Sequence, residues 1–92
     1  MISITAIIKS KKENNEQVKT MIENLVNQTR KEAACIRYDL HNSDNVYIIW
    51  EEWTDQAGLD LHNNQSYLQE FVTSSETYLA SQIQVYKTTQ IL

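Results

Sequence analysis

The order of hydrophobic and polar residues predicts a strand and then a helix at the start of the chain. Residues 2–9 form a short run rich in β-branched side chains, which is typical of a strand. Hydrophobic residues then recur at helical spacing from Val18 to Val26. Asn14 and Gln17 precede them with the spacing of a capping box, which predicts where this amphipathic helix begins.

The next part of the chain has the two-residue period of strands. Residues 35–41 alternate between hydrophobic and polar, which places Ile36 and Tyr38 together on one side of a strand. Four polar residues, 42–45, favour a hairpin loop, and they lead into a second strand over residues 46–53. The pattern therefore predicts a β-hairpin in the middle of the chain.

The remaining residues complete a recognisable order of elements. A helical stretch is expected from about Asp55, broken near Asn63 and Asn64, and an alternating strand over residues 83–88. The order β-α-β-β-α-β predicts an α+β, ferredoxin-like fold, with both helices on one face of a four-stranded antiparallel sheet. We expect residues 1–92 to form a single domain.

The strand 46–53 is hydrophobic on both of its sides. Alternation divides it into two sets, with Tyr47, Ile49, Glu51 and Trp53 on one face and Val46, Ile48 and Trp50 on the other. Which set faces a binding pocket is open from the sequence alone. An uncovered face of an antiparallel sheet is normally polar, so we expect a second copy of the chain to cover the outer face. The expected assembly is a homodimer whose sheets pack together.

Composition and charge exclude several classes of function. A net charge of −4 with only two arginines is unsuited to nucleic acid. One glycine and no proline exclude Gly-rich phosphate loops, and no apolar run is long enough for a membrane span. The two histidines and the lone Cys35 lack the spacing of a metal site, so no metal is expected. The N-terminus does not resemble a secretion signal, and we expect a cytoplasmic protein.

Two segments resemble a known family. Residues 32–38 (EAACIRY) resemble the E-x-G-C-x-x-Y stretch of the antibiotic biosynthesis monooxygenase domain, and residues 51–62 (EEWTDQAGLDLH) are similar to its E-x-W-x-d-x-x-a-L-x-x-H stretch. The resemblance covers almost the whole chain. It implies a dimeric α/β barrel, in which two ferredoxin-like sheets pack together, and oxygenation of quinols or polyphenols without any cofactor.

Two positions depart from the family pattern. Ala34 stands where the family usually has glycine, so the turn there must avoid positive φ or accept strain. Tyr67 stands where many members have a second histidine, which argues against a reaction that needs two imidazoles. Haem-degrading relatives need a tryptophan and a histidine further along, and none follows Trp53 and His62, so a haem reaction is disfavoured.

His62 and Glu51 are the predicted catalytic residues. A deprotonated phenol can give an electron to dioxygen without a metal or flavin, so the protein has to supply a base, and histidine suits that role near neutral pH. The resemblance implies this role for His62; the alternative is a surface histidine on a short helix. Glu51 is expected to orient the base, or else to form a structural salt bridge with Arg37.

Four further residues are predicted to bind the substrate. Trp53, Tyr67 and Tyr38 would supply aromatic walls, and Arg37 would hold an anionic substrate. The alternatives are core packing for the aromatic residues and a cross-strand pair for Arg37. We expect the pocket to lie between the helix-bearing face of the sheet and the segment 55–71.

Three functions follow from this reading. The first is a cofactor-independent monooxygenase that uses dioxygen to oxidise a small quinol or polyphenol. The second is an isomerase of a small oxygenated carbonyl compound, which would use the same base without consuming oxygen. The third is a non-catalytic dimeric module that binds a small molecule. Oxygen uptake separates the first from the other two.

Overall fold

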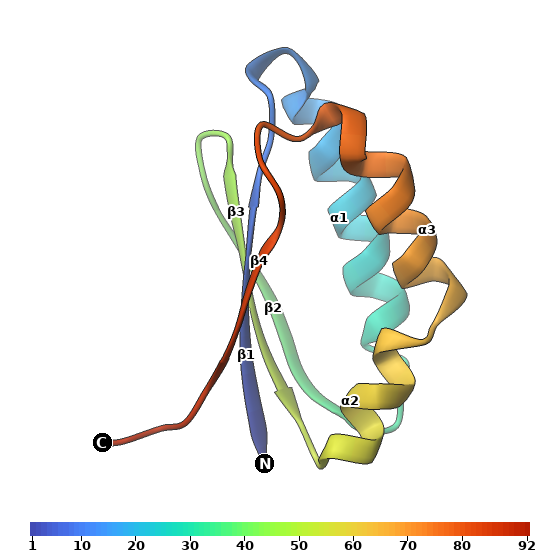
Figure 1. Cartoon of the computed structure of the whole chain (residues 1–92), viewed down its shortest axis with the longest axis vertical. Coiled ribbons are helices and arrows are strands. Elements are labelled where there is room, and N and C mark those ends of the chain that lie inside the picture. Colours follow the sequence, from blue (N-terminus) through green and yellow to red (C-terminus); the bar gives the residue numbers. More distant parts are fainter.

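A four-stranded antiparallel sheet with all its helices on one side makes up the protein (Figure 1). The computed structural model describes all 92 residues. Its strands and α-helices are β1 (Ile2–Lys9), α1 (Asn15–Thr29), β2 (Cys35–Ser43), β3 (Val46–Trp53), α2 (Gln56–Asn63), α3 (Ser66–Ser75) and β4 (Gln84–Thr88). The strands lie in the order β2-β3-β1-β4, and every neighbouring pair is antiparallel. This confirms the predicted ferredoxin-like fold and the predicted break in the second helical region.

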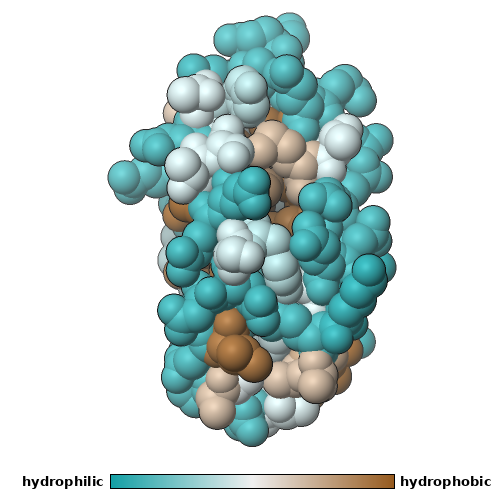
Figure 2. Space-filling model, turned by 90° about the vertical axis from the view of Figure 1, so that its right-hand side faces the viewer, coloured by the Kyte–Doolittle hydropathy of each residue, from teal (hydrophilic) through white to brown (hydrophobic).

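The core fills the space between the sheet and the helices. The hydrophobic side of α1 contributes Val18, Ile22, Leu25 and Val26, all buried, as the helical spacing predicts. The helix-bearing side is hydrophilic over most of its outer surface, with smaller hydrophobic areas between the polar ones (Figure 2). None of the helices has the length and apolar content that crossing a bilayer requires.

The two sets of residues in β3 have different surroundings. Tyr47, Ile49, Glu51 and Trp53 point toward the helices and are buried. Ile48 and Trp50 lie on the opposite, outer face, where they are 37% and 43% exposed. The question that the sequence left open is therefore resolved, because the set with Glu51 and Trp53 lies beneath the helices.

The start of β2 departs from the predicted alternation. Cys35 lies opposite Trp53 and Arg37 opposite Glu52, so the register shifts by one residue at Ile36. A bulge of this kind leaves an extra residue unpaired. Ile36 is accordingly exposed, whereas Cys35 packs against the core. The prediction that Ile36 shares the buried side of Tyr38 was wrong for this reason.

Two predicted turns also take a different form. A short 3₁₀ turn precedes α1, and Asn14 donates to the side chain of Gln17 at 2.8 Å instead of capping the helix backbone. The predicted start of the helix is confirmed, because Asn14 is its N-cap residue, but the hydrogen bonds of a capping box are not formed. The hairpin loop is shorter than expected, with only Asp44 and Asn45 between the strands. Asp44 adopts a φ of 50°, the left-handed region, which aspartate tolerates better than most residues.

Candidate active site

A cavity of about 620 Å³ lies between the helix-bearing face of the sheet, α2, α3 and the segment that leads into β4. Most of its lining is hydrophobic and includes Ile4, Ile8 and Phe71. Glu51 and His62 line the end of the cavity next to Ile4, which pairs with Glu51 in the sheet. The cavity thus lies where the sequence predicts a pocket, with two polar side chains at one end.

A close contact at its first turn positions the helix α2, which carries His62. Asp55 caps this helix by accepting from the backbone N–H of Gly58 at 2.7 Å. A Cβ atom on Gly58 would lie 2.2 Å from the Cβ of Ala34, so the chain can approach Ala34 here only because residue 58 is glycine. Ala34 itself has no positive φ, so its turn avoids that strain.

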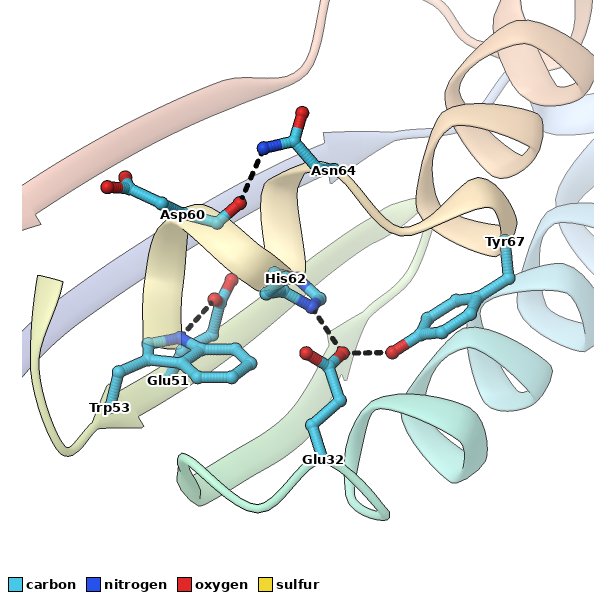
Figure 3. Close-up of polar contacts among 7 residues, drawn as sticks. All are labelled: Glu32, Glu51, Trp53, Asp60, His62, Asn64 and Tyr67. Atoms are coloured by element: carbon cyan, nitrogen blue, oxygen red, sulfur yellow. Dashed lines mark hydrogen bonds and ion pairs between the residues drawn. The ribbon is translucent and has the colours of Figure 1, made fainter. Parts of the chain in front are cut away.

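The imidazole of His62 is held by a carboxylate that the sequence reading did not single out. Its Nδ1 lies 2.7 Å from Oε2 of Glu32, and the hydroxyl of Tyr67 donates to the same oxygen (Figure 3). An ionised carboxylate can only accept hydrogen bonds, so we assign the ring proton to Nδ1. In the neutral imidazole the other ring nitrogen, Nε2, then carries no proton and can act as an acceptor.

Aromatic rings surround the imidazole and connect it to Glu51. The ring centroids of Trp53 and His62 are 4.5 Å apart with the planes tilted by 34°, and the centroid of Tyr38 lies 5.7 Å from that of His62. Nε1 of Trp53 donates to Oε1 of Glu51 at 3.0 Å (Figure 3). Trp53 therefore packs against the base and orients the acid.

Glu51 is a buried acid at the wall of the cavity. Burial raises the pKa of Glu51 to about 7, the nearby charge of Glu32 raises it as well, and the hydrogen bond from Trp53 opposes the shift. Its carboxyl group is therefore present in both protonation states near neutral pH. A group of this kind can either donate or accept a proton during a reaction.

The two tyrosines of the site are hydrogen-bonding groups and not bases. Burial raises the pKa of Tyr67 to about 12, and it raises the pKa of Tyr38 well above its ordinary value. Both phenols therefore keep their protons at neutral pH. For Tyr67 this agrees with its role as a donor to Glu32.

The structure brings three of the six predicted site residues to the cavity wall, namely His62, Glu51 and Tyr38. Trp53 and Tyr67 do not line the cavity. Both stand behind it, Trp53 in contact with the imidazole and with Glu51, and Tyr67 acting through Glu32.

Arg37 lies on the opposite face of the sheet. Its Nε is 3.0 Å from Oε1 of Glu52, and its guanidinium stands 4.3 Å from the ring centre of Trp50. A second carboxylate, that of Asp39, has its Oδ2 at 3.4 Å from Nη1 of Arg37. Arg37 thus forms the cross-strand pair given as its alternative, although with Glu52 and not with Glu51.

Comparison with known proteins identifies the family. Residues 1–74 match the model of the family described as antibiotic biosynthesis monooxygenase. The chain belongs to this family. Its sequence is 31% identical over 91 residues to "Putative monooxygenase YcnE" of Bacillus subtilis (strain 168), and the match covers 96% of each chain.

Solved structures agree with this family assignment. A crystal structure described as an antibiotic biosynthesis monooxygenase superposes with a TM-score of 0.93 at 25% identity and covers 100% of both chains. PA3566 from Pseudomonas aeruginosa superposes with a TM-score of 0.89 at 24% identity, covering 99% of this chain and 94% of that one. This second likeness supports the fold and not a function. The resemblance carried by residues 32–38 and 51–62 is therefore confirmed.

Glu32 is the site residue that the sequence reading missed. It is the first residue of the E-x-G-C-x-x-Y stretch shared with the antibiotic biosynthesis monooxygenases, and that position was the available signal. Its Oε2 receives two hydrogen bonds, whereas its Oε1 is buried without a partner.

Nowhere in the chain do three His, Cys, Asp or Glu side chains converge in an arrangement suited to a metal ion.

Proposed function

We propose that the protein is a cofactor-independent monooxygenase that uses dioxygen to oxidise a small quinol or polyphenol. The observation that carries the proposal is the pair of His62 and Glu32 at the polar end of a hydrophobic cavity. A general base must be unprotonated and must reach the substrate proton, and the bond from Nδ1 to Glu32 leaves Nε2 available for that task. Family membership supports a monooxygenase activity.

The reaction begins with a proton transfer inside the cavity. Nε2 of His62 takes a hydroxyl proton from the substrate, and Glu32 stabilises the imidazolium that forms, because an adjacent carboxylate favours the charged ring. Tyr67 fixes the position of Glu32 through its hydrogen bond. These three groups act as one unit, in which only His62 touches the substrate.

Oxygen chemistry follows from the phenolate that this transfer produces. The phenolate gives one electron to dioxygen, the two radicals combine at a ring carbon, and the hydroperoxide that results loses water. One oxygen atom stays on the ring and the other leaves as water, so a hydroquinone and dioxygen give a hydroxyquinone and water. Glu51, in its protonated form, supplies the proton to the peroxide, while the hydrophobic walls exclude water.

Substitution of the base tests the proposal. His62→Ala should lower kcat/KM for a quinol substrate by about 10²–10⁴-fold, the usual contribution of general acid–base catalysis. The matched control is His41→Ala, because His41 is exposed on β2 and lies outside the cavity. Oxygen uptake, together with the transfer of ¹⁸O from labelled dioxygen into the product, measures the activity. Equal activity of the two variants, or a product without labelled oxygen, would contradict the proposal.

The pairing of a base with an acid also favours a second candidate. His62 and Glu51 line the same end of the cavity, and such a pair can move a proton from one carbon to another in an oxygenated carbonyl compound. This isomerase would exchange substrate protons with deuterated water and consume no oxygen. Binding without turnover of either kind would leave the non-catalytic binding module as the function.

A further inference from the structure

Acidic side chains lie at both ends of the cavity. Glu51 lines the end next to Ile4, and Glu76 lines the other end. The position of Glu76 follows from the short 3₁₀ turn that it begins, because Leu79 just after that turn pairs with Ser10 beyond the opposite end of β1. No lysine or arginine is among the residues that line the cavity.

The positive side chains near the sheet do not compensate for these carboxylates. Lys87 lies beside Ile4 on β4, but its side chain is exposed and its Nζ donates to Gln56 Oε1 at 2.7 Å, outside the cavity. Arg37 is on the outer face of the sheet, paired with Glu52. An anionic substituent inside the cavity would therefore lose its hydration without gaining a lysine or arginine in return, and His62, the one basic side chain of the lining, already pairs with Glu32.

We infer that the cavity selects ligands without negative charge and that Glu76 is a specificity-determining residue at its far end. The inference rests on the proposed function, because it describes the substrate of the same site. From Ile4 to Ile8 the strand advances roughly 13 Å, at about 3.3 Å per residue. A fused aromatic ligand that extends along this length brings any charged substituent toward either Glu51 or Glu76.

The substrate class that fits is thus an uncharged phenol or quinol whose hydroxyl group lies at the His62 end. Its hydrophobic rings lie against the side chains of the sheet and of α3, such as Ile8 and Phe71. A carboxylate, sulfate or phosphate substituent would be rejected at either end. The sign of the charge, and not the size of the substituent, is the selected property.

Three ligands of similar size separate charge from shape, with binding to the intact protein measured by calorimetry at pH 7.5. The probes are 2-naphthol, the uncharged 6-hydroxy-2-naphthamide, and 6-hydroxy-2-naphthoate, which differs from the amide mainly in its charge. We expect the naphthoate to bind at least about tenfold more weakly than the amide, the effect of adding repulsion to the loss of hydration.

A charge reversal assigns the effect to Glu76. Glu76→Lys should raise the affinity for the naphthoate by about tenfold and leave that for the amide unchanged, and added salt should weaken this gain because the side chain is exposed. The matched control is Glu70→Lys, since Glu70 is an exposed residue of α3 that does not line the cavity. This control makes the same change in net charge and should alter naphthoate binding by less than about twofold.

The possible results test the charge selection, the assignment to Glu76 and the proposed function separately. Equal binding of the amide and the naphthoate would overturn the charge selection and leave the proposed function standing. An equal gain for the two lysine variants would overturn the assignment to Glu76. If neither uncharged ligand binds, the inference and the proposed function on which it rests both fail.

Discussion

The helix-bearing face and the outer face of the sheet are both hydrophobic, but only the first is covered within the chain. Four consecutive residues of β3 make the contrast sharp. Trp53 is fully buried, whereas Trp50 is 43% exposed, and Glu51 is buried, whereas Glu52 pairs with Arg37. Since the strand is hydrophobic on both sides, its sequence cannot distinguish the two faces. The faces differ in what packs against them, because the helices of the same chain cover only one. This packing determines how much each side chain contributes to stability and which chemistry it can perform.

The largest expected difference between the faces concerns the two tryptophans. Trp53→Ala should lower the free energy of unfolding by about 3–5 kcal/mol, because it removes a fully buried side chain from the core. Trp50→Ala should cost less than half as much, since its ring is partly exposed. Urea denaturation at two protein concentrations measures both effects and separates folding from association. Equal losses would mean that the outer face is buried as thoroughly as the core.

The two adjacent glutamates should respond differently to pH. Burial raises the pKa of Glu51 from 4.5 to about 7, so between these values the folded protein keeps a proton that the unfolded chain has lost. Stability should therefore fall as the pH rises through this interval, by up to about 3 kcal/mol, and stay lower above pH 7. Urea midpoints between pH 4.5 and 8 measure the slope.

Substitution at each glutamate tests the origin of that slope. Glu51→Gln should flatten the profile in this interval, whereas Glu52→Gln, one residue further on the outer face, should leave it in place. A profile that is unchanged in Glu51→Gln would assign the slope to another group.

A charge placed on the outer face of the sheet should dissociate the predicted dimer. We predict that a second copy packs against this face, because Ile48 and Trp50 are exposed there beside other hydrophobic side chains. Ile48→Glu should raise the dissociation constant of the dimer at least about tenfold, while the fold is kept. Leu61→Glu is the control, because Leu61 is 63% exposed on α2. Light scattering that finds the parent protein monomeric at micromolar concentration would contradict the dimer.

The smallest effect is expected at Arg37. Arg37→Ala should change the stability of the single subunit by less than about 1 kcal/mol, since within the subunit its ion pairs are partly exposed and screened by solvent. It should also leave kcat/KM for an uncharged quinol within about twofold, because the side chain lies on the face opposite the cavity. A tenfold fall in kcat/KM would instead support the sequence-based prediction that Arg37 binds the substrate.

The sequence predicts the strands and helices better than it predicts which side chains from distant parts of the chain contact one another. The periods of two and of about three to four residues identified the strands and helices, because one face of each element has to be buried. The bulge at Ile36 could not be predicted from the alternation, since an isoleucine fits the pattern whether it is paired or not. The role of Glu32 could not be predicted either. Its two partners, His62 and Tyr67, lie 30 and 35 residues away, and only the folded chain brings them together.

The contact between Gly58 and Ala34 also makes substitutions in the two segments that resemble the family depend on each other. Only one of these positions has room for a methyl group, because two Cβ atoms there would lie 2.2 Å apart. This chain carries the methyl group at position 34, which corresponds to the glycine of the E-x-G-C-x-x-Y stretch that it resembles, and has no side chain at position 58. Substitutions at the two positions are therefore epistatic. A gain of side chain at one is tolerated only with its loss at the other, and otherwise the helix that bears His62 has to move.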